Sequence, residues 1–446
     1  MLPKSDTIAA IATASGKGGI GVVRISGKDV VPIAEKILGI LPPPRSAFYT
    51  TFMDTTGETI DKGIALYFPA PHSYTGEDIL ELQGHGGPGV LNMLLQCTLD
   101  LGARVAQPGE FTQRAYLNDK IDLAQAESVA DLIDATTAQA AKSAMRSLVG
   151  EFSRIIQDLV AQLTDLRMLV EAMLDFPEEE LDGPDIKRRE YSLNTILDKL
   201  VNTLNLAQQG SLLREGAIVA LIGQPNVGKS SLLNCLSGEE VALVSEVPGT
   251  TRDLIRQSIQ LSGVPLHIVD TAGLRQTNDK VEQLGIERTH STILKADIIL
   301  LLLSHEKGLN IESKAILQML PVDTPRLFIQ NKIDLHEVAP HIEQQEGVTC
   351  IYLSAKTGAG IQLLRDELLK LIGWHQESGV FMARERHIRA LKQAEIHLNN
   401  AKSEISRAEL FAEELRLAQH SLSAITGEFT ADDLLGEIFS RFCIGK

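Results

Sequence analysis

The chain has 446 residues, too many for one ordinary hydrophobic core, so its length suggests two to four domains. Hydrophobic residues make up 44% and charged residues 22%, which is typical of globular proteins. The net charge of −16, from 42 Lys and Arg against 58 Asp and Glu, argues against tight unaided binding to a phosphate backbone. A nucleic acid substrate would therefore need a basic patch or a basic partner.

No stretch approaches about 18 uninterrupted apolar residues, and the densest run, Ile298–Leu303, has the length of a strand. The first ten residues lack the basic-then-apolar layout of a signal peptide. We therefore expect a cytoplasmic protein with no membrane span. The four cysteines lie far apart in the sequence and are expected to be buried or free thiols: Cys97, Cys235, Cys350 and Cys443.

Residues 1–118 are expected to form a mixed α/β domain. Apolar, β-rich runs with glycine-rich turns between them predict strands at Thr7–Thr13, Gly21–Ser26, Ile64–Phe68 and Ile79–Leu82. Two helices are predicted at Val30–Leu38 and Val90–Leu101. The run Pro42–Pro44 predicts a turn or a sheet edge.

From about Leu123 the pattern becomes helical. Apolar residues recur at spacings that alternate mostly between four and three, which predicts a single buried helix stripe through Leu148, Phe152, Ile155, Leu159, Leu163, Leu166, Val170 and Met173. Pro177 and the acidic run Glu178–Glu180 should end this helix, and a further helical stretch covers roughly Arg189–Gln208.

Between Gly216 and about Gly373 strands and helices alternate, which is typical of a parallel sheet with helices on both faces. A helical pattern of apolar residues returns after about Arg384. The economical interpretation is one discontinuous helical domain, residues 119–215 and 376–446, into which an α/β domain, residues 216–375, is inserted. Two separate helical bundles are the alternative.

A predicted strand, Ile218–Ile222, leads into a glycine-rich loop and then a predicted helix, Ser231–Leu236. The loop, Gly223-Gln224-Pro225-Asn226-Val227-Gly228-Lys229-Ser230, matches the G-x-x-x-x-G-K-S pattern in the strand–loop–helix context that this pattern requires. Its backbone N–H groups and the helix N-terminus suit phosphate. Lys229 should reach the β- and γ-phosphates, and Ser230 should ligate Mg²⁺. The predicted nucleotide contacts here are Asn226, Val227, Gly228, Lys229, Ser230 and Ser231.

The preference for guanine over adenine is predicted by Asn331-Lys332-Ile333-Asp334, which follows a predicted strand, Arg326–Gln330. The Asp334 carboxylate can accept both N1–H and the exocyclic amine of guanine, and adenine offers no such pair of donors. Ser354-Ala355-Lys356 follows a further predicted strand, Cys350–Leu353, and should close over the base through backbone N–H groups. In this order and spacing, the motifs predict a GTP site.

Two further segments are expected to respond to the γ-phosphate. Asp270-Thr271-Ala272-Gly273 should hold the Mg²⁺ shell through Asp270 and contact the γ-phosphate through the Gly273 N–H. The first switch is expected at Gly249-Thr250-Thr251-Arg252-Asp253, where Thr251 would close on Mg²⁺. Nucleotide contacts are also expected along the preceding residues, Ser245, Glu246, Val247 and Pro248. Two loops that the γ-phosphate holds and hydrolysis releases form a bistable element.

The residue after the Asp-x-x-Gly motif is Leu274, whose aliphatic side chain cannot position a water molecule. Three alternatives remain open from the residues alone. Arg275 or Arg252 could stabilise charge as an arginine finger does. The Glu282 carboxylate could orient or deprotonate the water, although a solvated acid at a helix start fits equally well. A bound monovalent cation could replace the charge of the finger.

At these motifs the chain resembles the family of tRNA modification GTPases MnmE (TrmE), within the TrmE–Era–EngA–YihA–Septin-like group of translation-factor-related GTPases. The resemblance runs over nearly the whole chain. Outside the GTPase motifs it rests on Gly18-Gly19-Ile20-Gly21-Val22-Val23-Arg24-Ile25-Ser26-Gly27, Tyr74-Thr75-Gly76-Glu77-Asp78, Glu81-Leu82-Gln83-Gly84-His85-Gly86-Gly87, Pro108-Gly109-Glu110-Phe111, Asp122-Leu123-Ala124-Gln125-Ala126-Glu127 and Phe442-Cys443-Ile444-Gly445-Lys446.

The resemblance implies an N-terminal domain similar to folate-dependent one-carbon enzymes, which also mediates homodimerisation, and a helical domain with an inserted G domain. It implies a GTP hydrolase that works with the FAD-containing partner MnmG in an α2β2 heterotetramer, so that FAD enters only through the partner. The product is an aminomethyl or carboxymethylaminomethyl group on carbon 5 of the wobble uridine of certain tRNAs. Potassium-dependent dimerisation of the G domains across their switch faces would drive the conformational change.

The resemblance also implies roles for individual residues. Glu282 would be the catalytic residue. The K⁺ ligands would be Asn226, Ser245, Val247 and Thr250, and Ser245 stands where a threonine is expected in close relatives but keeps the hydroxyl. The Mg²⁺ ligands would be Ser230 and Thr251.

A site for 5-formyltetrahydrofolate is implied at Arg24, Glu81, Lys120 and Lys446. A cation suits the glutamate tail of the folate, and a carboxylate can accept the N–H donors of the pterin. From the residues alone, Arg24 could be an edge-strand charge, Glu81 an ion-pair partner and Lys120 a solvated helix cation. His85 in the Gln-Gly-His-Gly-Gly turn is expected to be structural rather than a metal ligand.

Two rival functions remain from the sequence. A regulatory switch would pass its nucleotide state to an effector without modification chemistry of its own, and folate binding by residues 1–120 would argue against it. A ribosome-assembly GTPase would need a basic RNA-binding surface, and the net charge of −16 argues against that. The sequence leaves open the identity of the tRNAs, the order of the chemical steps, the role of Cys443 and the docking site of the FAD partner.

Overall fold

The computed structural model describes residues 6–175, 183–224, 226–237, 257–270, 296–304, 324–345, 347–375, 379–427, 432–440, 442–443 and 445. The chain divides into two compact units. Unit 1 comprises Met1–Ala130, Ser147–Ser192 and Ile396–Lys446, and unit 2 comprises Asp131–Arg146 and Leu193–Glu395. Each unit is therefore assembled from segments that are distant in sequence.

A six-stranded sheet in the order β3-β4-β5-β2-β1-β6 forms the first part of unit 1. Its neighbours are antiparallel except for the parallel pair β1·β6. The strands are β1 (Ile8–Ile11), β2 (Gly21–Ser26), β3 (Phe48–Met53), β4 (Thr59–Phe68), β5 (Ile79–Gly84) and β6 (Arg104–Val105). The prediction for Gly21–Ser26 is confirmed to the residue. β3 is absent from the expected strands because only Phe52 of its six residues is buried.

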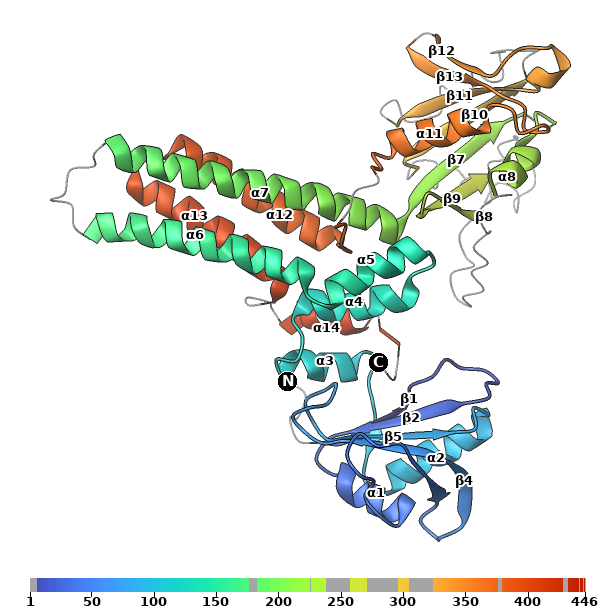
Figure 1. Cartoon of the computed structure of the whole chain (residues 1–446), viewed down its shortest axis with the longest axis vertical. Helices are drawn as coiled ribbons and strands as arrows, with labels where there is room; N and C mark the ends of the chain where they lie inside the picture. Colours follow the sequence, from blue (N-terminus) through green and yellow to red (C-terminus); the bar gives the residue numbers. More distant parts are fainter. Residues whose placement is uncertain are drawn as a thin grey trace, which may run out of the picture. The chain divides into compact units, whose positions relative to one another are not determined.

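Alternation along the strands sends side chains to two faces of this sheet. Ile25, Leu80 and Leu82 pack on one face, in an apolar cluster that they share with residues of the helices α1 (Val30–Leu38) and α2 (Pro88–Asp100). Figure 1 shows these two helices beside the sheet. On the other face, next to β1, Phe111 of α3 (Glu110–Leu117) joins a smaller apolar cluster. The predicted helix Val30–Leu38 is confirmed to the residue.

Helices from both sides of the inserted domain pack together within unit 1. α6 (Glu151–Asp175) and α13 (Ala408–Thr426) lie side by side (Figure 1), and Arg167 Nη1 donates a hydrogen bond to Gln419 Oε1 at 2.7 Å. This contact confirms one discontinuous helical domain rather than two separate bundles. The other described helices of the helical domain are α4 (Leu123–Asp134), α5 (Ala138–Leu148), α7 (Gly183–Glu215), α12 (Glu385–Ser403) and α14 (Asp432–Ser440). Of these, α14 belongs to unit 1, most of α5 belongs to unit 2, and α4, α7 and α12 each contribute residues to both units.

The expectation that one helix carries the whole stripe from Leu148 to Met173 is wrong at its start. Leu148 ends α5, and Gly150 has a left-handed backbone (φ +85°) that interrupts the helix before Glu151. The side-chain amide of Gln125 donates to the Leu148 carbonyl at 2.9 Å, which satisfies a carbonyl that the interruption leaves free. The apolar spacing in the sequence does not reveal this interruption, because a single glycine barely changes the pattern. Pro177 and Glu178–Glu180 lie outside the described residues.

Unit 2 is built on a seven-stranded sheet in the order β12-β13-β11-β10-β7-β9-β8. The five inner strands are parallel, and the edge strands β12 and β8 are antiparallel to their neighbours. This confirms the parallel α/β domain. The strands are β7 (Ala217–Gly223), β8 (Gln257–Leu261), β9 (Val264–Asp270), β10 (Ile298–Ser304), β11 (Arg326–Asn331), β12 (His341–Gln345) and β13 (Val348–Tyr352).

Both faces of this sheet are buried. The side chains of Leu221, Leu300 and Ile329 belong to one apolar cluster, and those of Ile222, Leu301 and Phe328 belong to another. Fully buried parallel strands read as continuous apolar runs, which is why β7 and β10 stand out in the sequence. The helical elements among the described residues of this domain are α8 (Lys229–Ser237), the short 3₁₀ helix η1 (Ile333–Leu335) and α11 (Ile361–Leu371).

The longest helices are α6, of 25 residues, and α7, of 33 residues. Both carry charged side chains along their length, as a helix in aqueous surroundings does. Among the helices within the described ranges, none combines the length and the apolar character needed to cross a lipid bilayer.

Candidate functional site

The glycine-rich loop lies between the end of β7 at Gly223 and the start of α8 at Lys229, as the sequence predicts. Lys229 Nζ donates to the Gly223 carbonyl at 2.7 Å, so its ammonium group lies at the beginning of the loop. Val227 is 5% exposed and packs into the core beneath the sheet, which anchors the loop. Ser230 and Ser231 are exposed on the first turn of α8, whose N-terminus favours anions.

Gly228 must be glycine for two reasons. Its backbone is left-handed (φ +101°), and a Cβ atom there would lie 2.3 Å from Nδ2 of Asn331. The close approach lets Asn331 Nδ2 donate to the Val227 carbonyl at 2.7 Å. Asn331 Oδ1 accepts the backbone N–H of Ala355 at 2.9 Å, and the side chain is 2% exposed. One buried amide therefore joins the phosphate loop to both predicted guanine loops.

The guanine loops are also joined to each other. Ser354 Oγ donates to Asp334 Oδ1 at 2.6 Å, and the serine is fully buried while the aspartate is exposed. Lys332 has a left-handed backbone (φ +70°) and precedes η1, which carries Asp334. The carboxylate is thus held from one side by a buried hydroxyl and remains accessible to a ligand.

The motifs meet at one edge of the sheet. Gly223, Asp270 and Asn331 stand at the carboxyl ends of β7, β9 and β11, which are parallel. In the registers, Leu302 of β10 is opposite Gly223, and Leu221 of β7 is opposite Asp270. Ligands of open parallel α/β sheets bind outside this edge.

Part of the predicted site lies outside the described residues. These residues are Pro225, Ser245, Glu246, Val247, Pro248, Gly249, Thr250, Thr251, Arg252, Thr271, Ala272, Gly273, Leu274, Arg275 and Glu282. Of the predicted K⁺ ligands the structure describes Asn226, which is exposed with a left-handed backbone (φ +63°). Of the predicted Mg²⁺ ligands it describes Ser230. The roles of all these residues stay predictions.

In the N-terminal sheet the structure brings two predicted folate residues together. Arg24 on β2 and Glu81 on β5 are register partners, and Arg24 Nε donates to Glu81 Oε1 at 2.9 Å. The guanidinium carbon lies 5.8 Å from the ring centroid of Tyr74 and 5.7 Å from that of Phe111. The two side chains are 25% and 16% exposed, so the pair is partly open to a ligand.

Of the other two predicted folate residues, the structure does not pair Lys120 with Arg24 or Glu81. Lys120 is exposed, and its Nζ donates to the Pro71 carbonyl at 3.0 Å. Lys446 lies outside the described residues. Its neighbour Gly445 packs so closely under the end of β1 that a Cβ atom would lie 2.3 Å from the Ile11 carbonyl oxygen.

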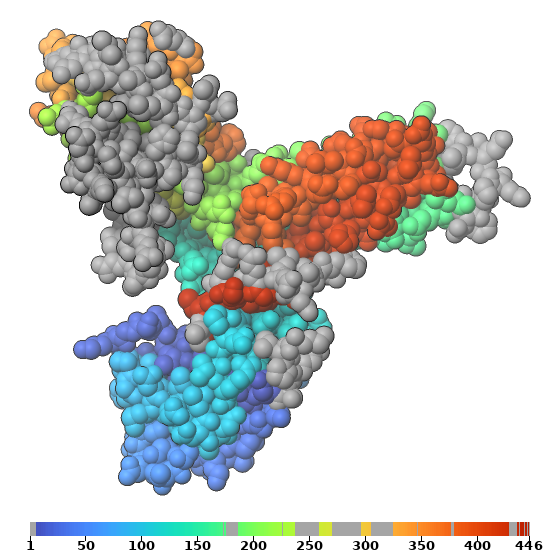
Figure 2. Space-filling model, turned by 180° about the vertical axis from the view of Figure 1, so that it is seen from behind, coloured from blue at the N-terminus to red at the C-terminus, as the bar shows by residue number. Residues whose placement is uncertain are grey.

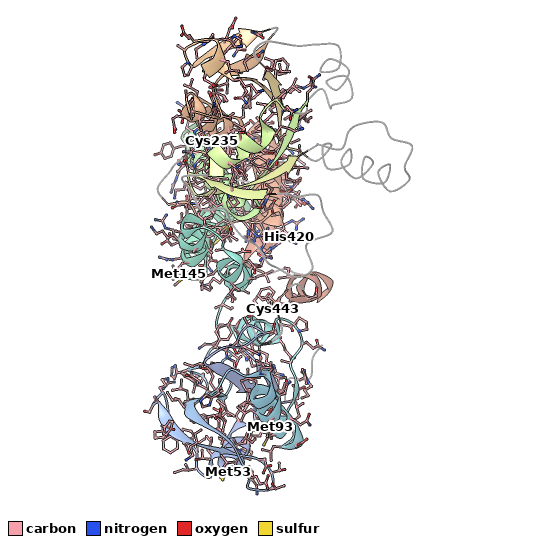
Figure 3. All side chains as sticks on the ribbon, turned by 90° about the vertical axis from the view of Figure 1, so that its right-hand side faces the viewer. Met53, Met93, Met145, Cys235, His420 and Cys443 are labelled. Atoms are coloured by element: carbon pink, nitrogen blue, oxygen red, sulfur yellow. The ribbon has the colours of Figure 1, made fainter. Side chains whose placement is uncertain are left out.

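The segment around Cys443 contacts the Pro-Gly-Glu-Phe motif. The Gly109 N–H donates to the Cys443 carbonyl at 3.3 Å, and a Cβ atom on Gly109 would lie 2.8 Å from the Phe439 carbonyl oxygen. α14 contacts α3 next to this point, and Figure 2 shows the red surface of α14 beside the cyan surface of α3. The Cys443 side chain, labelled in Figure 3, is exposed.

Sequence reasoning misses a buried charge cluster that connects two of the quoted motifs. Arg114 Nη1 donates to Glu77 at 3.0 Å, and its Nη2 donates to Glu110 at 3.0 Å and to Asp6 at 2.7 Å. Arg104 Nη1 donates to Glu110 Oε2 at 2.8 Å. The only signal in the sequence is the helical spacing of Glu110 and Arg114.

Glu110 has no exposed side-chain surface. Burial raises the pKa of this carboxyl group, but hydrogen bonds from Arg104, from the Gln107 N–H and from Arg114 outweigh burial and hold the pKa below its usual range. Its carboxylate is thus fully engaged within the protein.

Comparisons with known proteins agree with this arrangement. The family model described as the GTP-binding protein TrmE N-terminus matches residues 7–120, and the one described as the MnmE helical domain matches residues 123–443. A tRNA modification GTPase MnmE from Nitrosospira multiformis is 58% identical over 452 residues, covering 100% of each chain. The protein of the same name from Nitrosomonas europaea is 58% identical over 451 residues, again covering 100% of each.

A third relative of that name, from Dechloromonas aromatica, is 57% identical over 448 residues and covers 99% of this chain and 100% of its own. Full-length identity at this level accompanies a conserved fold, and the resemblance seen in the motifs is confirmed. The chain belongs to the family of tRNA modification GTPases MnmE (TrmE).

Proposed function

We propose that this chain hydrolyses GTP in a potassium-dependent reaction within a complex that modifies tRNA. The partner is the FAD-containing protein MnmG, and the product carries an aminomethyl or carboxymethylaminomethyl group on carbon 5 of the wobble uridine. The observation that carries the GTPase half of this proposal is the buried amide of Asn331, which joins the phosphate loop to the guanine loops.

Recognition of guanine is assigned to Asp334. Its carboxylate accepts from Ser354 and remains exposed, so it can accept two further N–H donors from a purine edge. Adenine would present one donor and leave the carboxylate partly unpaired, which is costly once the base excludes water. The backbone N–H groups around Lys356 would complete the pocket over the base.

Recognition of the phosphates is assigned to the loop that ends in Gly228, to Lys229 and to the N-terminus of α8. The left-handed backbone and the absence of a Cβ at Gly228 leave N–H groups free to face phosphate oxygens. Lys229 would exchange the Gly223 carbonyl for phosphate oxygens. Mg²⁺, held by Ser230 and Thr251, would neutralise phosphate charge.

The hydrolytic step is assigned to Glu282, which would orient the attacking water in place of the glutamine that other GTPases use. K⁺, with Asn226, Ser245, Val247 and Thr250 as ligands, would supply the positive charge that an arginine finger supplies elsewhere. The exposed side chain of Asn226, at the mouth of the phosphate loop, is compatible with this role. Dimerisation of the G domains would bring the switch faces together.

The N-terminal domain, residues 1–118, is assigned to folate binding and homodimerisation. Among the described residues Arg24 engages Glu81 through Nε alone, so its Nη groups remain for a ligand carboxylate. Lys120 and Lys446 would add positive charge for the folate tail, and Glu81 would accept from the pterin. The other domain bounds are likewise proposals: the helical domain at 119–215 and 376–446, and the G domain at 216–375.

The proposal is tested by measuring GTP hydrolysis in K⁺ and in Na⁺ for the unaltered chain and for Glu282→Ala. We expect the rate to fall in Na⁺ and in the variant, while the affinity for GDP, measured by calorimetry, stays the same. Equal rates in the two salts would exclude the potassium site. A fully active variant would remove Glu282 from catalysis, and no heat from guanine nucleotides would overturn the nucleotide site itself.

A further inference from the structure

One carboxylate in unit 2 holds the segments through which the G domain is joined to the helices. Asp131 lies on α4, and Arg214, near the end of α7, donates from Nε to Asp131 Oδ1 at 2.9 Å. Arg384, immediately before α12, donates to the same oxygen from Nη2 at 2.7 Å. The Asp131 carboxylate is largely shielded from water, because the residue is 7% exposed, whereas the Arg214 side chain is 31% exposed.

A second contact joins the helices to the hairpin β8–β9 of the G domain. Thr137 Oγ1 donates to the Gly263 carbonyl in the hairpin turn at 2.9 Å and accepts the Ala140 N–H at 3.0 Å. Thr137 is 4% exposed and caps α5. The turn has no spare room, because a Cβ atom on Gly263 would lie 2.8 Å from Cβ of Gln139.

The position of this hairpin in the chain is significant. β8 begins shortly after the predicted first switch, Gly249–Asp253, and β9 ends at Asp270, which opens the predicted second switch. In the sequence the hairpin therefore lies between the two segments that should respond to the γ-phosphate, close to the end of the first and directly before the second.

The hairpin is tightly packed against the junction. Leu261 and Val264 share an apolar cluster with Ala140 and Ala144 of α5 and with Leu213 of α7. The ring of His267 on β9 lies between Ser258 Oγ at 3.0 Å and the Glu215 carbonyl at 3.1 Å. Close packing of this kind transmits a displacement instead of absorbing it.

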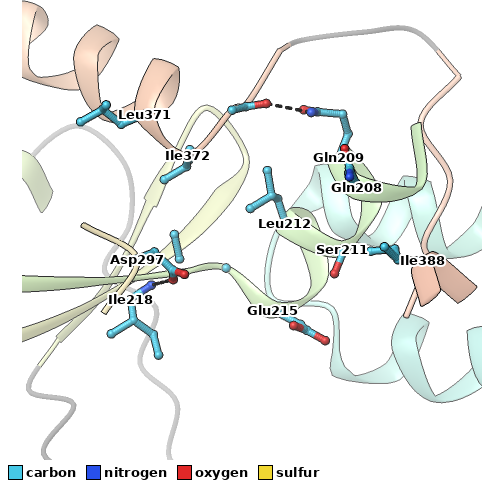
Figure 4. Close-up of a pocket in the computed structure, with 13 residues that line it drawn as sticks. Gln208, Gln209, Ser211, Leu212, Glu215, Ile218, Asp297, Leu371, Ile372 and Ile388 are labelled. Atoms are coloured by element: carbon cyan, nitrogen blue, oxygen red, sulfur yellow. Dashed lines mark hydrogen bonds between the residues drawn. The ribbon is translucent and has the colours of Figure 1, made fainter. Parts of the chain in front are cut away.

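Another part of the junction is hollow. A cavity of about 620 Å³ lies between the last turn of α7, the start of β7 and the end of α11 (Figure 4). The Gln209 side chain spans this side by donating to the Gly373 carbonyl at 2.8 Å and accepting the His375 N–H at 2.9 Å. The junction is therefore closely packed at the hairpin and open beside α11, so we place the coupling at the hairpin contacts.

We infer that Thr137 and Asp131 are positioning residues that couple the nucleotide state of the G domain to the helices, and hence GTP hydrolysis to tRNA modification. When the hairpin turn moves, Thr137 should move with it through its hydrogen bond to Gly263. Asp131 should make α4, α7 and the start of α12 move together, because it pairs with Arg214 and Arg384. Neither residue is part of the nucleotide pocket. This inference rests on the proposed function.

The test uses the full chain with MnmG, tRNA and GTP in K⁺, and it compares Thr137→Val with Thr137→Ser. Valine keeps the shape and removes the hydroxyl, whereas serine keeps the hydroxyl. For the valine variant we expect GTP hydrolysis within about twofold of the unaltered chain and modified uridine per GTP reduced about tenfold, within the usual span of coupling factors. The serine variant should behave as the unaltered chain.

Asp131→Asn should shift the same ratio in the same direction, and Asp134→Asn, an exposed aspartate on the same helix, is the matched control that should change nothing. The single tryptophan, Trp374, is 5% exposed near the junction and supplies a second readout. Its fluorescence change on GTP binding should be smaller in Thr137→Val. A valine variant with unaltered modification per GTP, or with parallel loss of both activities, overturns the inference alone. Absence of GTP hydrolysis by the unaltered chain overturns the proposed function as well.

Discussion

The buried charge cluster around Glu110 and the polar loops around Asn331 differ in how far they are closed. Glu110 is fully buried and receives hydrogen bonds from two arginines and a backbone N–H, so its carboxylate has no capacity left for a ligand. The loops around Asn331 are tied together by one buried amide, but they leave Asp334 and Lys356 exposed. The first cluster stabilises the fold, whereas the second leaves polar groups accessible to a ligand.

The difference teaches how motif residues are to be interpreted. Glu77 and Glu110 belong to motifs as distinctive in sequence as those of the nucleotide site, and the structure uses them in ion pairs with Arg114. Distinctive spacing marks a constrained position, and only the completed hydrogen-bond inventory separates a structural constraint from a binding one. Arg24 and Glu81 are intermediate, because they pair with each other through Arg24 Nε while both stay partly exposed.

The largest expected effect is on the open cluster, in Asp334→Asn. Of the two charge-assisted hydrogen bonds to guanine, of about 1.5–3 kcal/mol each, one would lose its charge and the other would be replaced by two opposed N–H donors, so we expect GDP affinity to fall by roughly 10³-fold. An asparagine amide can donate to the additional carbonyl of xanthine, so xanthosine diphosphate should bind the variant better than GDP does. Calorimetry with both nucleotides measures this. Glu337→Gln, an exposed acid in the same loop, is the control, and equal GDP affinity in Asp334→Asn would remove Asp334 from base recognition.

In the buried charge cluster, Glu110→Gln should lower the stability of the domain and leave nucleotide binding unchanged. Removing a buried charge that pairs with Arg104 and Arg114 should lower the free energy of unfolding of unit 1 by about 3 kcal/mol. The folded-state pKa of Glu110 is lowered, so its contribution is present above its ordinary pKa of about 4.3 and is lost as pH falls through the folded value.

Thermal unfolding between neutral pH and pH 3 measures this effect. The unaltered chain should lose more stability in the acid range than Glu110→Gln, because the variant has no carboxylate to protonate there. Glu58→Gln, an exposed acid in the same domain, should follow the unaltered chain. Identical pH profiles for Glu110→Gln and the unaltered chain would contradict the proposed weight of the cluster.

The effect of Asn331→Ala should be intermediate, because this substitution removes buried hydrogen bonds within the nucleotide loops. The Val227 carbonyl and the Ala355 N–H would lose their partner, at a cost of about 2 kcal/mol in the stability of the G domain. GDP affinity should fall together with the unfolding temperature. Asn234→Ala on the exposed side of α8 is the matched control. Unchanged stability and affinity would show that the loops hold their positions without this amide.

The smallest effect is expected for Glu81→Gln. A partly exposed ion pair contributes little, so the free energy of unfolding should change by less than about 1 kcal/mol. Binding of 5-formyltetrahydrofolate, followed by fluorescence or calorimetry, should weaken several-fold in this variant and in Arg24→Lys, which loses the planar fork. A folate affinity that neither substitution changes would place the folate elsewhere or nowhere on this domain.

Much of the fold is predictable because its elements are strongly patterned. β2, α1 and the β7–α8 unit follow from apolar periodicity and a glycine-rich loop between strand and helix. β3 and the interruption at Gly150 do not, since the first is hardly buried and the second depends on one left-handed residue. Side-chain pairing across the sheet, as between Arg24 and Glu81, depends on strand order, which periodicity does not contain.

The packing of α6 against α13 has a consequence for biosynthesis. The two helices are separated in the chain by the whole G domain, so the ribosome completes α6 long before its partner exists. Leu159, Leu163 and Leu166 of α6 are buried in the folded chain. During the synthesis of roughly half the chain, α6 therefore carries this apolar stripe without α13 beside it. The elements of the G domain, from β7 to α11, are continuous in the chain and are made in that interval, so α6 must wait for its partner while another sheet is completed.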